Sequence, residues 1–329
     1  MSETDKRLNI KMINENEKKT MSGSSRNQTR TYLMERFETL GIHPRGKLGQ
    51  NFLIDLNLLR LLHESANIEE NDVILEVGTG TGSLTGSMSE KAASVITVEI
   101  DPIMYEMAKQ ELADRNNIRF VFADILRNKN RLNEDVLQII EEEIKAAPDR
   151  RFKLCANLPY SVATPLLSNL LLSNRPPFSM TVTIQKELAD RIVAKPSTKD
   201  YGALSVWMQA ICDANIIRIM PPSVFWPRPK VDSAIIQLLY NPKKRKRIPD
   251  LKFLHEFVRS IFFHRRKFLR SVLCSTFKNK LPKEVIDEVL IELSLNETSR
   301  AESLSVKQIL TLCEAFRNRL PENERSLLS

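Results

Sequence analysis

The order of hydrophobic and polar positions divides the chain into a polar beginning and a long region of helix and strand patterns. Residues 1–30 contain almost no bulky apolar side chains that could offset the entropy of ordering, so we expect a disordered tail there. The stretch 31–40, TYLMERFETL, predicts a short helix that Gly41 would end in a left-handed conformation. Residues 56–68, LNLLRLLHESANI, have apolar side chains at helical spacing and predict a further helix.

Five short apolar runs follow, with helical patterns between the earlier ones. We expect a strand at each of DVILEVG (72–78), SVITVEID (94–101), IRFVFAD (118–124), FKLCANL (152–158) and SMTVTIQ (179–185). Strands that alternate with helices are typical of right-handed crossovers and a doubly wound, mostly parallel α/β sheet. A later run, SAIIQLLY (233–240), indicates one more strand.

The end of the chain has a different pattern. Residues 241–250, NPKKRKRIPD, form a basic block bounded by Pro242 and Pro249, which predicts a domain boundary near residue 245. Helical periodicity then recurs four times, so we expect a small all-helical C-terminal domain. The predicted division is a tail at 1–30, a sheet domain at 31–245 and a helical domain at 246–329.

Composition narrows the classes of partner and compartment. The formal net charge of +8 favours a polyanionic partner such as nucleic acid, although a basic surface without such a role is an equal alternative. The four cysteines are scattered, which predicts neither a metal site nor a disulfide framework. There is no apolar run near the roughly 20 residues that cross a bilayer, and no signal-peptide core. We therefore expect a soluble, cytoplasmic protein without membrane contacts, and a monomer.

A glycine-rich turn follows the first predicted strand. In ILEVGTGTGSLT, Gly78, Gly80 and Gly82 stand between a strand and a helix, where backbone can approach a ligand closely. The nicotinamide dinucleotide fingerprint needs glycine at the sixth position of this loop, which is Ser83 here. The spacing is instead G-x-G-x-G, preceded by Glu76.

Acidic residues end the next two predicted strands. Glu99 could accept hydrogen bonds from ribose hydroxyls, which fits NAD and S-adenosylmethionine equally well. Asp124 could accept one from an adenine amino group. Because no phosphate-binding lysine accompanies these acids, and because a sulfonium cation is attracted to carboxylates, S-adenosylmethionine is favoured. The alternative is that Glu99 and Asp124 are only helix caps.

The fourth predicted strand ends in the sequence Asn157-Leu158-Pro159-Tyr160. If the Asn157 side-chain oxygen and the Leu158 carbonyl accept the two N–H bonds of an adenine amine, they favour a tetrahedral nitrogen that can attack a methyl group. Pro159 would hold the carbonyl in place, and Tyr160 offers a ring for stacking. Phe225, in the proline-rich PPSVFWPRPKVDSA, is either a second stacking ring or a core residue.

These segments, in this order, resemble the ribosomal RNA adenine dimethyltransferase family. The resemblance depends on LGQNFLID, LEVGTGTGSLT, VEID, FADIL, NLPY and PPSVFWPRPKVDSA. It points to the enzymes of the KsgA/RsmA type, which dimethylate two adjacent adenines in the 3′-terminal hairpin of 16S rRNA during small-subunit assembly.

The resemblance also implies roles for individual residues. It implies cofactor contact by Asn51, Leu53, Gly78, Gly80, Glu99, Asp124 and Asn157, with GQNFL closing over S-adenosylmethionine. It implies a target-adenine site at Asn157, Leu158, Pro159 and Tyr160, with Phe225 as the stacking partner. FHRRKFLRSVL resembles the arginine-rich start of an rRNA-binding helix, which implies RNA contact by Arg265 and Arg266; Ser271 stands where an asparagine is usual.

Two alternative functions remain on this fold. Related enzymes that methylate 23S rRNA and confer macrolide resistance tend to read SQNF, whereas Gly49 precedes Gln50 here, which favours the small-subunit enzyme. The second alternative is a non-catalytic nucleic-acid-binding factor, because mitochondrial transcription factors of this superfamily use the same fold chiefly to engage nucleic acid and partner proteins. The intact glycine loop and NLPY sequence argue against that role.

Overall fold

A computed structural model describes residues 30–39, 41–296, 298–321 and 325. The predicted tail at 1–30 lies outside the described residues except for Arg30, with which helix α2 (Arg30–Thr39) begins. Gly41 follows α2 with a φ of +59°, as predicted, and helix α3 spans Leu56–Ser65. In the part of the chain that the structure describes, every helix is too short or too polar to span a bilayer.

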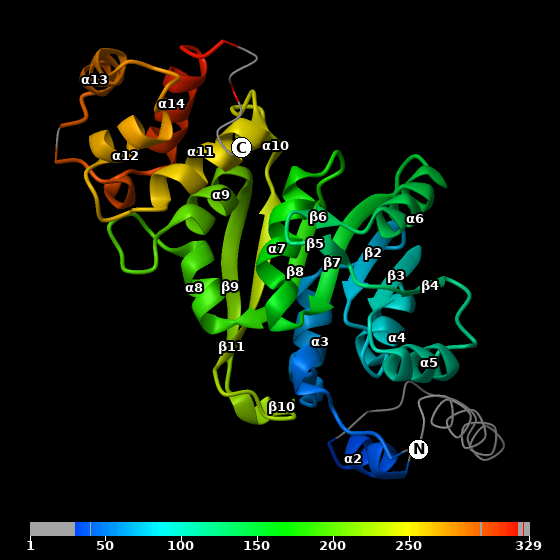
Figure 1. The fold of residues 1–329 in the computed structure, drawn as a ribbon. Coiled ribbons are helices and arrows are strands. Elements are labelled where there is room, and N and C mark those ends of the chain that lie inside the picture. The colour runs from blue at the N-terminus through cyan, green and yellow to red at the C-terminus, as the bar shows by residue number, and fades with distance from the viewer. Residues whose placement is uncertain (1–29, 40, 297, 322–324, 326–329) are drawn as a thin grey trace. The chain divides into compact units, whose positions relative to one another are not determined.

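The framework of the fold is a seven-stranded sheet with the strand order β4-β3-β2-β7-β8-β11-β9 (Figure 1). The β3–β4, β2–β3, β2–β7 and β7–β8 ladders are all parallel. Six strands coincide with predicted runs, so the predicted fold class is confirmed. The strands are β2 (Asp72–Val77), β3 (Ser94–Glu99), β4 (Ile118–Phe122), β7 (Arg151–Asn157), β8 (Ser179–Gln185), β9 (Cys212–Met220) and β11 (Ser233–Tyr240).

Strand order determines where a ligand can bind. From β2 the chain continues to β3 and β4 on one side, and it then returns to the other side of β2 with β7 and β8. This reversal leaves a crevice at the carboxyl ends of β2 and β7, the usual ligand position in an open α/β sheet. A buried ion pair joins the opposite ends of the two strands, with Lys153 Nζ 2.6 Å from Asp72 Oδ2.

The helices between these strands pack along the sheet. Helix α4 (Ser83–Ser89) packs on β3, and α5 (Pro102–Glu111) packs on β3 and β4. Helix α6 (Glu134–Lys145) packs on β2, β3 and β7, and α7 (Tyr160–Leu172) packs on β8.

Short or polar strands were missed by the sequence prediction. Strand β9 has the sequence CDANIIRIM, whose polar residues obscure the alternation, and it lies at the edge of the sheet. Strands β1 (Phe52–Leu53) and β10 (Phe225–Trp226) form an antiparallel pair, and β5 (Leu126–Asn128) pairs with β6 (Arg131–Leu132). Strands of two or three residues have no periodicity to detect.

The chain forms two compact units whose division differs from the boundary predicted near residue 245. One unit comprises the described residues up to Lys186 with Ile216–Gln237, and the other comprises Glu187–Asn215 with the described residues from Leu238 onward. The second unit contains α8 (Lys186–Val193) almost entirely, α9 (Ala203–Ile211), α10 (Pro242–Arg245) and the helices predicted for the C-terminal region. Those are α11 (Leu251–Phe262), α12 (Leu269–Thr276), α13 (Lys283–Glu292) and α14 (Val306–Arg317).

Burial of α9 explains the difference. Its sequence ALSVWMQAI is apolar on nearly every side, and within the second unit it packs against α10, α11 and α14. The preceding loop is held there as well, because Tyr201 is fully buried and its hydroxyl donates a hydrogen bond to the Leu304 carbonyl at 2.9 Å. A basic block can therefore mark a change in composition without coinciding with the boundary between two compact units.

Candidate active site

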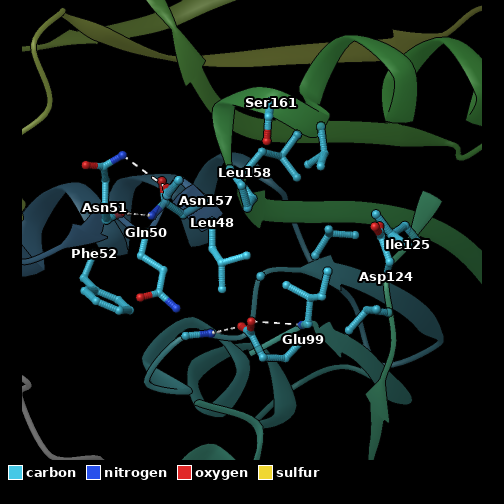
Figure 2. Close-up of a pocket in the computed structure, with 18 of the residues that line it drawn as sticks. Leu48, Gln50, Asn51, Phe52, Glu99, Asp124, Ile125, Asn157, Leu158 and Ser161 are labelled. Carbon is cyan, nitrogen blue, oxygen red and sulfur yellow. Dashed lines mark hydrogen bonds between the residues drawn. The ribbon is translucent and has the colours of Figure 1, made fainter. Parts of the chain in front are cut away.

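A cavity of about 250 Å³ lies at the predicted crevice of the sheet (Figure 2). Its walls come from the segment before β1, the loops after β2, β3 and β4, and the turn after β7. Eight of the predicted site residues line it: Asn51, Gly78, Gly80, Glu99, Asp124, Asn157, Leu158 and Pro159. Residues separated by more than a hundred positions in sequence therefore meet at one site.

Two glycines in the loop after β2 are required by close packing. Gly78 has a φ of +86°, and a Cβ there would lie 3.2 Å from the Pro159 Cδ. Gly80 has a φ of +54°, and a Cβ there would lie 3.1 Å from the Phe52 ring. Both positions combine a left-handed backbone with a close neighbour, so a side chain would be strained and would displace the wall of the cavity.

Glu99 places a largely buried carboxylate at the end of β3. Its Oε2 accepts a hydrogen bond from the Gly80 N–H at 2.9 Å, and its Oε1 accepts from the Ile100 and Asp101 N–H groups. Burial raises the pKa of Glu99, and the bonds from Asp101 and Gly80 partly oppose that rise. A carboxylate has about four acceptor positions, so three backbone donors leave room for about one more partner. The N-cap of α5 is Asp101, so Glu99 is not a helix cap.

Asp124 is exposed at the cavity wall. Its Oδ1 accepts from the Leu126 N–H at 2.8 Å, which forms a local turn before β5 rather than a helix cap. Among the described residues that line the cavity, the charged side chains are Glu99 and Asp124, and none is basic. This environment disfavours a phosphate and suits a cation or a donor-rich nucleoside.

Glu76, which precedes the glycine loop, does not reach the cavity. It is buried in β2, where its Oε2 accepts hydrogen bonds from Thr85 Oγ1 at 2.5 Å and Thr97 Oγ1 at 2.7 Å. Burial raises the pKa of Glu76 to about 8. It supports the strand and the first turn of α4 beneath the glycine loop.

Asn157 is oriented by the segment before β1. Its Nδ2 donates a hydrogen bond to the Asn51 carbonyl at 2.9 Å, and Figure 2 shows the two residues side by side at the cavity. Because this bond occupies the amide nitrogen, the oxygen Oδ1 is left as the acceptor. The Leu158 N–H donates to the Thr183 carbonyl at 3.2 Å, and among the described residues no donor reaches the Leu158 carbonyl oxygen.

Gln50 also lines the cavity, and the sequence analysis did not single it out. Its Nε2 donates to Asp101 Oδ2 at 2.9 Å, and its Oε1 accepts from the Arg45 N–H at 2.7 Å. The only available signal was its place in GQNFL, beside Asn51. Its partner Asp101 follows the acidic strand end in VEID.

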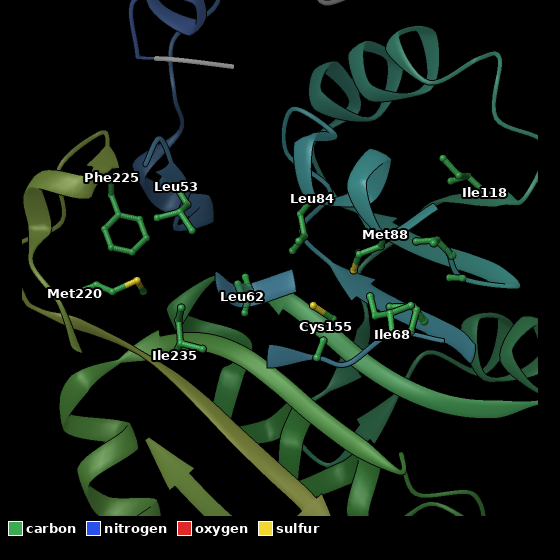
Figure 3. Close-up of a cluster of buried hydrophobic side chains, with 14 residues drawn as sticks. Leu53, Leu62, Ile68, Leu84, Met88, Ile118, Cys155, Met220, Phe225 and Ile235 are labelled. Carbon is green, nitrogen blue, oxygen red and sulfur yellow. The ribbon is translucent and has the colours of Figure 1, made fainter. Parts of the chain in front are cut away.

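Three of the residues predicted for the cofactor and adenine sites do not line the cavity. Tyr160 is half-buried at the start of α7, and its hydroxyl lies 2.6 Å from Ser233 Oγ. Leu53 and Phe225 are paired across β1 and β10, and Figure 3 shows their side chains together in the hydrophobic core. Only 3% of Phe225 is exposed. In this conformation Phe225 is therefore a core residue, which was one of the two predicted alternatives.

The two predicted RNA-contacting arginines have different surroundings in the second unit. Arg265 Nη1 donates to the Lys199 carbonyl at 2.9 Å and to the Tyr201 carbonyl at 3.1 Å, and Nε lies 3.7 Å from Glu302. Arg266 is exposed, with no partner among the described residues. Arg265 therefore has a structural role of its own, whereas Arg266 is available to a partner.

Comparison with known proteins identifies relatives over most of the chain. Residues 42–317 match the family model described as ribosomal RNA adenine dimethylase. Ribosomal RNA small subunit methyltransferase A of Alkaliphilus oremlandii is 41% identical over 83% of this chain and 92% of its own length. The protein of the same name from a Geobacillus species is 36% identical over 86% of this chain and 95% of its own length.

Solved structures share the fold. A dimethyladenosine transferase from Plasmodium falciparum aligns with a TM-score of 0.66 and 23% identity over 80% of this chain and 97% of that one. The 23S rRNA methyltransferase ErmE aligns with a TM-score of 0.57 and 23% identity over 81% of this chain and all of that one. The fold alone thus does not separate the two kinds of enzyme, but the sequence matches do. On these grounds the chain belongs to the ribosomal RNA adenine dimethylase family.

Proposed function

We propose that this protein dimethylates N6 of two adjacent adenines in the 3′-terminal hairpin of small-subunit rRNA, with S-adenosylmethionine as methyl donor. Family membership and the names of the relatives, ribosomal RNA small subunit methyltransferase A, support this function. The observation that supports the chemistry most directly is the orientation of Asn157, whose amide nitrogen is bound by the Asn51 carbonyl so that its oxygen is left for a substrate.

The cavity fits the proposed cofactor. Gly78 and Gly80 keep its floor free of side chains, and Glu99 retains room for a ribose hydroxyl. Asp124 offers its second carboxylate oxygen to the adenine amino group. When bound, S-adenosylmethionine would supply an electrophilic methyl group on a sulfonium, whose positive charge suits a wall with two acids and no base. Leu53 does not line the cavity and its side chain is buried in the core, so its predicted cofactor contact is not part of this proposal.

Asn157 and Leu158 would activate the target amine by geometry. The lone pair of an adenine amino nitrogen is delocalised into the ring, which makes the nitrogen a poor nucleophile. Acceptors at the Asn157 side-chain oxygen and the Leu158 carbonyl would favour a tetrahedral nitrogen with a localised lone pair. Pro159 has a φ of −58° and no N–H, which fixes the direction of the preceding carbonyl.

No strong general base is needed at this site. As the nitrogen bonds to the methyl carbon, the bond from that carbon to sulfur would break and leave a neutral thioether. The nitrogen, now positively charged and acidic, would release its proton to water. Burial raises the pKa of Tyr160, partly opposed by the bond with Ser233, so its hydroxyl stays protonated. Tyr160 would instead stack on the target base, and aromatic stacking is worth about 1–3 kcal/mol per base. That gain would offset the cost of extruding an unpaired adenine.

A methyl-transfer assay tests this function. The protein and labelled S-adenosylmethionine are incubated with each of three substrates in separate reactions: immature 30S particles, naked 16S rRNA and 23S rRNA. We expect label as N6,N6-dimethyladenosine in the small-subunit RNA. Label in 23S rRNA alone would assign the enzyme to the macrolide-resistance type, and RNA binding without transfer would favour a binding factor.

A further inference from the structure

The segment 49–52, which ends with the first residue of β1, contacts several parts of the site. Gly49 lies against the turn after β7, where a Cβ would be 3.6 Å from the Pro159 Cβ. Asn51 Nδ2 donates to the Gly49 carbonyl at 3.2 Å, and the Asn51 carbonyl accepts from Asn157 Nδ2 at 2.9 Å. Phe52 packs over Gly80 in the loop after β2. The position of this segment therefore determines how the Asn157 amide is oriented.

Gln50 connects the segment to α5. Its Nε2 donates to Asp101 Oδ2 at 2.9 Å, while its Oε1 accepts from the Arg45 N–H at 2.7 Å, so both ends of the amide are fixed. Asp101 is 2% exposed and caps α5 through the Ile103 and Met104 N–H groups. Its own N–H donates to Glu99 Oε1 at 2.9 Å. A continuous series of hydrogen bonds thus connects the wall of the proposed ribose site with Gln50.

We propose that Gln50 is a positioning residue: through Asp101 it holds the segment 49–52 against the site, and so keeps the Asn157 amide oxygen turned toward the target amine. The inference rests on the proposed function. It assigns Gln50 an effect on turnover in addition to its contact with the cavity. If Gln50 were only part of the cofactor wall, saturating cofactor would restore the full rate to a variant. If it orients Asn157, the rate stays low at saturation.

Exchanging the amide and the carboxylate between positions 50 and 101 gives a rescue variant. In Gln50→Glu, one carboxylate oxygen can still accept from the Arg45 N–H, but the other cannot donate to Asp101, so the bond to Asp101 is lost. The two carboxylates then face each other, and Arg45 Nε, 3.6 Å from Asp101 Oδ2, offsets only part of their repulsion. In the double variant Gln50→Glu with Asp101→Asn, the new amide can donate to the new carboxylate, so the bond is restored with its direction reversed. Asparagine is as good an N-cap as aspartate, so α5 keeps its cap. Gln138→Ala is the matched control, because Gln138 Nε2 donates to Glu142 Oε1 at the same 2.9 Å on the exposed face of α6.

Two measurements test the proposal. Hydrogen–deuterium exchange on the cofactor-free protein should show faster exchange of backbone amides 48–53 in Gln50→Ala and Gln50→Glu, and slower exchange again in the double variant. At saturating cofactor and small-subunit RNA, kcat should fall roughly tenfold or more in both single variants, because small misplacements of an orienting group are costly. The double variant should recover most of kcat, and Gln138→Ala should match the wild type.

Other outcomes would overturn the proposal or the function separately. A Gln50→Ala variant with raised KM for the cofactor but wild-type kcat would reduce Gln50 to a wall residue. A double variant no better than Gln50→Glu would also refute the coupling. A wild-type protein without methyl transfer to small-subunit RNA would instead contradict the proposed function, while the exchange experiment would still report on the hydrogen bonds of Gln50.

Discussion

At the scale of single residues, the proposed chemistry depends most on the Asn157 amide. Asn157→Ala should abolish methyl transfer, because it removes the acceptor that would localise the lone pair of the target nitrogen. Asn157 is only partly buried, and its side chain has one hydrogen bond among the described residues, to the Asn51 carbonyl. We therefore expect a loss of only about 1 kcal/mol in the free energy of unfolding. Transfer assays and urea unfolding measure both effects. Near-normal turnover in this variant would refute the proposed role of Asn157 in binding the target amine.

Tyr160 separates a ring function from a hydroxyl function. Tyr160→Phe removes the bond to Ser233, which should cost about 1 kcal/mol of stability while it leaves the stacking face in place. Tyr160→Ala should lower kcat/KM for RNA by roughly tenfold or more, since a stacked base is worth about 1–3 kcal/mol. Steady-state kinetics of the two variants compare these effects. Equal losses in both would assign the role to the hydroxyl.

At the scale of the element, β2 contains a carboxyl group that makes stability depend on pH. The pKa of Glu76 is about 8 in the folded chain, above its ordinary value of 4.5, because the carboxyl is buried. Between these values the folded state retains a proton that the unfolded state has released. The contribution of Glu76 to stability is therefore complete below about pH 4.5 and is lost as the pH rises through about 8.

Glu76→Gln should remove this dependence, because the amide resembles the neutral acid. We expect the free energy of unfolding of the variant, relative to the wild type, to rise with pH across that window, by at most about 1.4 kcal/mol per pH unit. Urea unfolding at several pH values measures the difference. Glu99, whose pKa is also raised, is present in both proteins and largely cancels. Parallel curves for the two proteins would contradict the assignment.

Sequence patterns predicted elements where many residues share one environment. The strands that became β2, β3, β7 and β8 are buried on both faces and read as continuous apolar runs, so their order revealed the sheet and the site at its edge. Phe225 was ambiguous because an aromatic in a proline-rich loop can face either way, and its pairing with Leu53 is a tertiary property. Gln50 was missed because its partner Asp101 is fifty-one positions away.

At the scale of the whole molecule, the net charge of +8 predicts a salt-dependent association with RNA, and the two neighbouring arginines should contribute to it differently. Arg266→Ala should leave stability unchanged and reduce the slope of log K against log salt by about 0.7 to 0.9, the value of one phosphate contact. Arg265→Ala should also lower the free energy of unfolding, because Arg265 holds the carbonyls of Lys199 and Tyr201.

Two measurements on the same proteins distinguish a lost RNA contact from a loss of stability. They are the binding of small-subunit RNA over a range of salt concentrations and unfolding in urea. Lys283→Ala is the matched control, since it removes one exposed charge from α13 in the same unit. If net charge alone governed binding, Lys283→Ala and Arg266→Ala would weaken it equally. A reduced slope only in Arg266→Ala would instead locate a phosphate at that side chain, and an unchanged slope in both would leave Arg266 a solvated surface residue.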